Sequence, residues 1–191
     1  MKFSRYFLGL SSALFAAGLL LSGSVASAAK TQVEGTPVPT PPKPDFSRAQ
    51  YLIGTWTCSD LSSRRPGPFT TTQVYSMDPT GYWLLRDDTI HKASWIPRDI
   101  HSQARITYDA RAKKLVRITY GDQGGYSLAT APMTAGNQLT YTYVSQTKAA
   151  DVSSYASEIF TKVSDTKKTL TTSFTENNGR VVTVKETCTK S

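Results

Sequence analysis

The fold of this chain is decided by two short stretches of its 191 residues, YLIGTWTCSD at residues 51–60 and GRVVTVKETCTKS at residues 179–191. They contain the chain's two cysteines, Cys58 and Cys188. Alternation along an extended strand puts each cysteine on one face with its neighbours, Leu52, Gly54 and Trp56 in the first stretch and Val182, Val184 and Glu186 in the second. A disulfide between the cysteines would join the first strand of a sheet to the last. The two stretches therefore predict a sheet that closes on itself.

The first 28 residues have the pattern of a secretory signal peptide. Its three parts are a positive start at Lys2 and Arg5, an apolar stretch at residues 7–21 and the small-residue cleavage pattern ASA at residues 26–28. The apolar stretch is short and interrupted by glycine and serine, which favours cleavage over a membrane anchor. We expect a periplasmic or secreted protein with no membrane span after residue 28. A disulfide persists in such compartments.

Residues 29–47 form a tail rich in proline and threonine, with TPVPTPPKP at its centre. Proline favours extended polyproline II and removes backbone donors, so we expect a disordered tail before a single domain at residues 48–191. Without the first 28 residues, 20 basic residues stand against 14 acidic ones, a net charge of +6. The basic residues form no continuous stripe. This favours a mildly basic surface, and no nucleic-acid partner is expected.

From about residue 48 the pattern is all-β. Threonine, valine, isoleucine and tyrosine are abundant, and several segments alternate with a period of two. Turn signals separate these segments, and Asn178-Gly179 is a strong hairpin signal. A long meander exposes two edges unless it closes, so we predict an antiparallel up-and-down β-barrel of about 8–10 strands. A β-sandwich is the alternative.

A family resemblance begins with Gly54-Thr55-Trp56 in the expected first strand. A Gly-x-Trp followed by an antiparallel meander resembles the lipocalin and calycin barrels. The stretches TGYWLLRDDTI, ITYDARAKKLVRITYGDQGGY and NQLTYTYV resemble an uncharacterised bacterial secreted family with a calycin-like, nitrobindin-like barrel. The resemblance covers most of residues 48–191 and implies the fold more than any activity.

Two properties of these families depend on particular residues. In lipocalins a basic residue of the last strand packs across the first-strand tryptophan, and Lys185 and Arg180 are the candidates for that position in this chain. Lys185 falls on the face opposite Cys188 by alternation. Nitrobindin-like haem binding needs a proximal histidine, whereas His91 and His101 lie in the middle of the chain. No haem, metal or other cofactor is therefore expected.

Aromatic residues are the candidate ligand-binding residues. An inward-facing tyrosine or tryptophan offers an apolar body with one polar group, which suits an amphipathic ligand in a barrel interior. The candidates are Trp56, Trp83, Trp95, Tyr108, Tyr120 and Tyr141. Plain core packing is the alternative role for the same residues.

Three functions remain open on the sequence. The favoured one is an exported, non-catalytic barrel that binds a small, partly apolar ligand in its interior. The second is an envelope interaction or structural protein with a solid core and no ligand. The third is a metal-dependent enzyme that uses the densest polar cluster, Asp87, Asp88, His91, Asp99 and His101. That spacing matches no zinc pattern, and no Gly-x-Ser-x-Gly motif is present.

Overall fold

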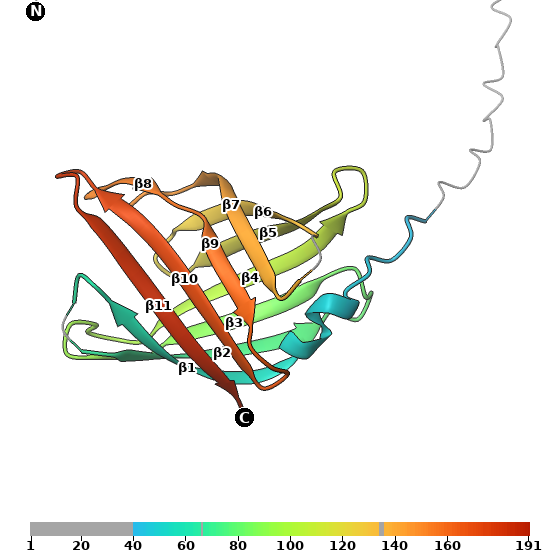
Figure 1. Ribbon diagram of the computed structural model, residues 1–191, viewed down its shortest axis with the longest axis horizontal. Helices are drawn as coiled ribbons and strands as arrows, with labels where there is room; N and C mark the ends of the chain where they lie inside the picture. Colours follow the sequence, from blue (N-terminus) through green and yellow to red (C-terminus); the bar gives the residue numbers. More distant parts are fainter. Residues whose placement is uncertain (1–39, 66, 134–135) are drawn as a thin grey trace, which may run out of the picture. The chain divides into compact units, whose positions relative to one another are not determined.

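Ten antiparallel strands close into a ring in the computed structural model, which describes residues 40–65, 67–133 and 136–191 (Figure 1). The predicted signal peptide and most of the predicted tail lie outside the described residues. The strands are β1 (Gly54–Ser62), β2 (Phe69–Met77), β3 (Leu84–Ile90), β4 (Ile100–Asp109), β5 (Lys114–Gly121), β6 (Tyr126–Pro132), β7 (Gln138–Gln146), β8 (Val152–Tyr155), β9 (Glu158–Lys162), β10 (Lys167–Glu176) and β11 (Val181–Lys190). All of them except β8 belong to the ring.

The ring closes between the first strand and the last. β11 pairs with β10 on one edge and with β1 on the other. Cys58 lies directly opposite Cys188 in the β1–β11 register, and a disulfide joins them. Their Cα atoms are 3.9 Å apart, well inside the limit of about 7 Å for a bridge. The predicted closed barrel and its disulfide are confirmed, and the sandwich alternative is wrong.

One short strand interrupts the simple up-and-down order. β9 pairs with β10 through Lys168–Thr171, and β8 pairs with the same edge of β10 through Phe174–Glu176. The two strands thus divide one edge of β10 between them, and β9 alone continues the ring to β7. The turn between β10 and β11 is the hairpin predicted from Asn178-Gly179, and Gly179 has a φ of +85° there.

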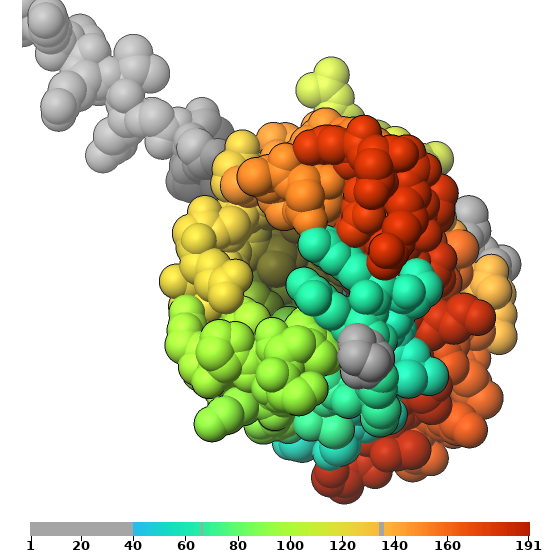
Figure 2. All heavy atoms as spheres, turned by 90° about the vertical axis from the view of Figure 1, so that its left-hand side faces the viewer, coloured from blue at the N-terminus to red at the C-terminus, as the bar shows by residue number. Residues whose placement is uncertain are grey.

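The two ends of the barrel differ. The short 3-10 helix η1 (Ser47–Leu52) packs at one end, where Phe46, Ala49 and Leu52 join the buried core. Phe46 belongs to the core although it precedes the expected domain start. The opposite end contains the β1–β2, β3–β4 and β10–β11 connections, and Figure 2 shows a hollow at the centre of the strands there. Among the described residues, no helix is long and apolar enough to cross a membrane.

Candidate functional site

Trp56 is the central residue of the closed half of the barrel. It is fully buried, and its indole Nε1 donates to the carbonyl of Leu52 at 2.7 Å. The ammonium groups of Lys168 and Lys190 lie 4.8 Å and 5.6 Å from its ring centroid. Lys190 is the basic residue of the last strand that packs across Trp56, a position for which the sequence suggested Lys185 or Arg180.

Gly54 is required by this arrangement. Its φ is +124°, a conformation that side chains with a Cβ rarely adopt. A Cβ at this position would also lie 2.8 Å from Cε of Lys190. The Gly-x-Trp motif thus places a tryptophan in the core and leaves room for a lysine to cross beside it.

Beyond Trp56 the interior becomes polar. Seven charged side chains project inward from β1, β3, β5, β9, β10 and β11, which are Asp60, Arg86, Asp88, Arg117, Glu158, Lys168 and Glu186. Six of them are at least nine-tenths buried, and Glu186 is half-buried. Burying this many charges is costly unless each has a partner. The layer therefore has to be understood contact by contact.

Two ion pairs account for four of these charges. Arg86 Nη2 lies 2.8 Å from Asp88 Oδ2 in an ion pair, and Arg117 Nη2 donates to Glu158 Oε2. Burial alone would raise the pKa of Glu158, but the charges of Arg117 and Arg86 lower it overall. The Arg117 guanidinium also lies 4.4 Å from the ring centroid of Tyr141.

Lys168 has neutral partners instead. Its Nζ donates to Gln73 Oε1 at 2.7 Å and to the Tyr75 hydroxyl at 3.0 Å. Burial is the main cause that lowers the pKa of Lys168, to about 7, and the nearby charge of Arg86 acts in the same direction.

The remaining carboxyl groups, Asp60 and Glu186, form a pair. Burial raises the pKa of Glu186 to about 8, and the charge of Asp60 adds to that rise. Burial also raises the pKa of Asp60 to about 6, against the hydrogen bond from Thr71. Asp60 Oδ2 accepts from the Thr71 hydroxyl at 2.5 Å, and Glu186 Oε2 accepts from Gln73 Nε2 at 3.1 Å. Both shifts are upward, so the pair holds a proton more readily than exposed carboxyl groups do.

A cavity of about 250 Å³ lies over this polar layer, on the side of the open end. Its polar lining comes from Thr71, Gln73, Arg86, Asp88, Ser102, Glu158 and Glu186. Its apolar lining comes from Phe69, Ile90, Leu170 and Val184. The lining is more polar than that of most small-molecule sites, but it combines convergent polar groups with apolar contacts, as such sites do.

Several buried polar atoms in this region have no hydrogen-bond partner. They include Asp60 Oδ1, Asp88 Oδ1 and Arg86 Nε, and the first two are acceptors. A buried polar atom without a partner costs about 1–3 kcal/mol, so such atoms mark places where a ligand or ordered water improves the site. Asp88 and Arg86 both line the cavity.

The six aromatic candidates occupy four different places. Trp56 and Tyr141 are buried in the core of the barrel, and Tyr108 packs against it. Trp83 is half-buried just before β3. Trp95 lies at the open end, where its ring packs edge to face on Phe69 at 5.2 Å, and Phe69 lines the cavity. None of the six candidates lines the cavity itself.

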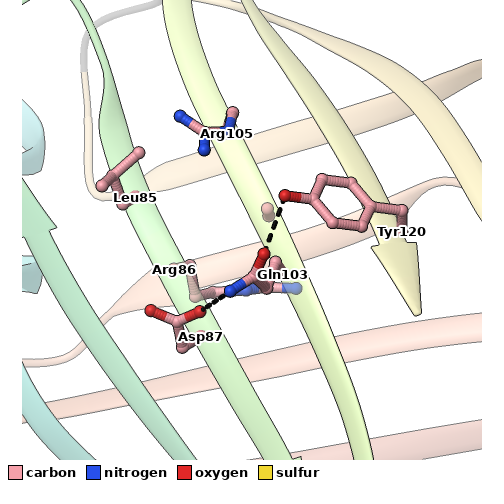
Figure 3. A pocket seen from close by; sticks show the side chains of 7 residues that line it. Leu85, Arg86, Asp87, Gln103, Arg105 and Tyr120 are labelled. Carbon is pink, nitrogen blue, oxygen red and sulfur yellow. Dashed lines mark hydrogen bonds between the residues drawn. The ribbon is translucent and has the colours of Figure 1, made fainter. Parts of the chain in front are cut away.

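Tyr120 lies on the outside of the barrel. It is 40% exposed, and its hydroxyl donates to Gln103 Oε1 at 2.7 Å. Gln103 Nε2 in turn donates to Asp87 Oδ1 at 2.7 Å, so the three side chains form a chain across β3, β4 and β5 (Figure 3). They border a shallow surface pocket of about 50 Å³.

The structure does not gather the Asp and His cluster into one site. Asp87 is exposed on the outer face of β3, whereas Asp88 is buried on the inner face. His91 Nδ1 lies 3.6 Å from Asp99 Oδ2, while His101 Nδ1 contacts the Thr89 hydroxyl at 3.2 Å. The group in the described residues with metal-ligand proximity is Cys58, Glu186 and Cys188, and its cysteines are joined in the disulfide.

The sequence did not lead us to predict the polar layer of inward-facing charged residues. Arg86 and Asp88 follow Leu84 at intervals of two, so the signal for an inward charge was present in LLRDDTI. Glu186 likewise shares the face of Val182, Val184 and Cys188. These charged residues lie at inward-facing positions, and that placement can be found in the sequence alternation.

Comparison with known proteins gives the following. The closed antiparallel barrel is the topology that the sequence resemblance implied. No protein-family model and no curated protein matches the sequence. Among solved structures, the chain is similar to EF1p2_mFAP2b bound to DFHBI, with 12% identity, a TM-score of 0.41 and coverage of 77% of this chain and 100% of that one.

A second similar structure is a protein of unknown function from the DUF3598 family of Nostoc punctiforme. The identity is 18%, the TM-score is 0.38, and the alignment covers 83% of this chain. It covers 53% of the other chain, so this protein spans about half of that relative's length. At these TM-scores, neither likeness carries a functional argument.

Proposed function

We propose that this protein is an exported, non-catalytic barrel that binds a small, partly apolar molecule in the open half of its interior. The observation that carries this proposal is the cavity of about 250 Å³ between the polar layer and the open end of the barrel. On this measure a single water molecule needs about 10–15 Å³, so the cavity has room for a small organic molecule. A ligand with a short apolar body and one polar group suits such a space.

The lining supports an amphipathic ligand. Phe69, Ile90, Leu170 and Val184 offer apolar contacts, and burial of apolar surface contributes about 25 cal/mol per Å². The polar layer offers carboxyl and guanidinium groups whose positions are already fixed by the ion pairs Arg86–Asp88 and Arg117–Glu158. A polar group of the ligand would therefore meet partners that need little reorganisation.

Export is supported by two features of the chain. The pattern of residues 1–28 is that of a signal peptide, and the Cys58–Cys188 disulfide fits an oxidising compartment. A periplasmic or secreted location, and membership of a bacterial secreted family, are part of this proposal.

Filling the cavity tests the proposal. Val184 lines the cavity from β11, and the next residue, Lys185, is exposed on the outer face of the same strand. We expect Val184→Trp to weaken the binding of 1-heptanol at least tenfold, measured by amide chemical-shift titration, while the control Lys185→Trp binds as the unchanged protein does. Equal binding by both variants, or saturable shifts confined to the outer wall, would contradict the proposed site.

A further inference from the structure

We infer that the ligand of this cavity carries a protonated amine, which the Glu186 carboxyl contacts at the cavity wall with the Asp60 carboxyl behind it. The inference rests on the proposed function and names the chemical class of its ligand. It is carried by the placement of these two carboxyl groups, by the pairing of the other charges around them, and by a third acceptor on the cavity wall.

Asp60 and Glu186 are direct neighbours across the closing strands. They are register partners in the β1–β11 pairing, two residues beyond the disulfide, and both project inward. Like charges placed directly opposite each other destabilise a sheet. A bound cation, or a shared proton, removes that repulsion.

The other interior charges are already engaged. Arg86 pairs with Asp88, and Arg117 pairs with Glu158. Lys168 is the remaining cation, and it donates to neutral oxygens of Gln73 and Tyr75. Among the described residues, no ion pair includes Asp60 or Glu186. The pair therefore lacks a positively charged contact, and Glu186 faces the cavity where one would arrive.

A separate acceptor points to the same place. Asp88 Oδ1 is buried, lacks a hydrogen-bond partner and belongs to a residue that lines the cavity from β3. An ammonium group has up to three N–H donors and no acceptor. The Glu186 carboxyl on β11 and the free oxygen of Asp88 on β3 offer acceptors to the ammonium group from two sides of the cavity. Asp60 lies next to Glu186 and outside the cavity lining.

The composition of the wall distinguishes an amine from an anion. Three carboxyl groups, those of Asp88, Glu158 and Glu186, line the cavity beside one guanidinium, that of Arg86. Nη2 of that guanidinium is already held by Asp88. An anionic head group would meet one guanidinium, whose Nε has no partner, against three carboxyl groups, whereas an ammonium group would gain acceptors.

Protonation supports the same inference. The charged groups around Glu186 are Asp60 on β1, Arg86 and Asp88 on β3, Glu158 on β9 and Lys168 on β10. Burial raises the pKa of Glu186 to about 8, so the empty site keeps a proton at neutral pH. Binding of an ammonium group favours the ionised form, and the proton of Glu186 passes to solvent. Amine affinity should therefore rise as pH increases up to about 8 and level off above that value.

Three probes of similar size and different charge test the inference, namely 1-heptylamine, 1-heptanol and hexanoate. We expect heptylamine to bind at least tenfold more tightly than either of the others in isothermal titration calorimetry near pH 7.5. The observed enthalpy of heptylamine binding should depend on the ionisation enthalpy of the buffer, because the buffer takes up the proton that binding releases. Glu186→Gln should remove the preference for the amine and leave heptanol affinity within about threefold, and Asp60→Asn should act in the same direction.

The matched control is Asp87→Asn, the same change of a carboxylate to an amide on the outer face of β3. It should leave the amine preference intact. If heptanol binds and heptylamine binds no better, the inference is overturned while the proposed function stands. If none of the three probes binds, both are overturned. An amine preference that survives in both Glu186→Gln and Asp60→Asn also overturns the inference.

Discussion

Lys168 holds an ammonium group inside the barrel, where it is 2% exposed and bonded to neutral oxygens. The rings of Tyr75 and Trp56, at 4.3 Å and 4.8 Å, partly replace the water that it has lost. This replacement is incomplete, since burial still lowers the pKa of Lys168 to about 7 from an ordinary value of 10.5. The charged form of this one residue therefore opposes folding at neutral pH.

The sign of this effect predicts a pH dependence of stability. Between pH 7 and 10.5 the unfolded chain binds more protons at this residue than the native state, so its contribution to stability rises with pH. The slope is at most about 1.4 kcal/mol per pH unit. The pKa of Glu186 is raised to about 8, so the contribution of Glu186 to stability falls as pH rises toward 8. The effect of Lys168 is therefore best measured from pH 8 to 10.

We therefore expect Lys168→Met to lose this rise in the free energy of unfolding, measured by urea titration at several values from pH 8 to 10. Lys167→Met is the control, because Lys167 is the exposed neighbour on the same strand. The interpretation fails if both variants keep the same pH slope as the unchanged protein.

At the scale of the element, the β10–β11 hairpin depends on the conformation of one turn residue. Gly179 has a φ of +85°, and its amide donates to the carbonyl of Glu176 at 2.9 Å. No atom lies within 4 Å of a Cβ placed on it, so the cost of a side chain there comes from the backbone alone. This hairpin positions β11, the strand that carries Glu186 and Cys188.

Gly179→Ala should lower the free energy of unfolding by about 1–2 kcal/mol, because a residue with a Cβ is disfavoured at positive φ. Gly125 supplies a control, since its surroundings are equally open and its φ is not in the positive region. Gly125→Ala should be neutral or slightly stabilising. Equal losses in the two variants, measured by chemical denaturation, would argue against a conformational origin.

At the scale of the whole molecule, the disulfide fixes the closure of the barrel. It joins residues 130 positions apart, at the point where β1 meets β11. A chain-entropy estimate for such a loop gives about 5 kcal/mol. Replacing both cysteines, as Cys58→Ala with Cys188→Ala, should therefore lower the free energy of unfolding by up to about 5 kcal/mol.

Far-ultraviolet circular dichroism should show that this double variant keeps its strands, since the β1–β11 pairing remains. Reduction of the unchanged protein serves as the control and should produce a comparable loss of stability. A loss below about 1 kcal/mol in both experiments would mean that strand pairing alone determines closure, because a long loop should give far more.

The sequence predicted the fold better than the site, for a physical reason. Period-two alternation and the two cysteines report which face of a strand is inward, and that is enough for a closed sheet. The same alternation could not say which inward residues fill space and which border a void. Trp56 and Tyr141 are inward and packed, whereas the cavity is lined largely by polar side chains such as Gln73 and Asp88. Void volume depends on packing across the barrel, between strands distant in sequence.

The packing of η1 against one end has a kinetic consequence. Phe46 and Leu52 fill that end together with Trp56, and the space left beside Tyr141 and Phe160 is only about 10 Å³. A molecule in the larger cavity must therefore leave by the route through which it entered. If the proposed ligand binds there, its residence time would depend on the rim, where Trp95 packs on Phe69, and its equilibrium affinity on the carboxyl groups beneath. Changes at the rim would therefore alter the association and dissociation rate constants by the same factor and leave the equilibrium affinity unchanged.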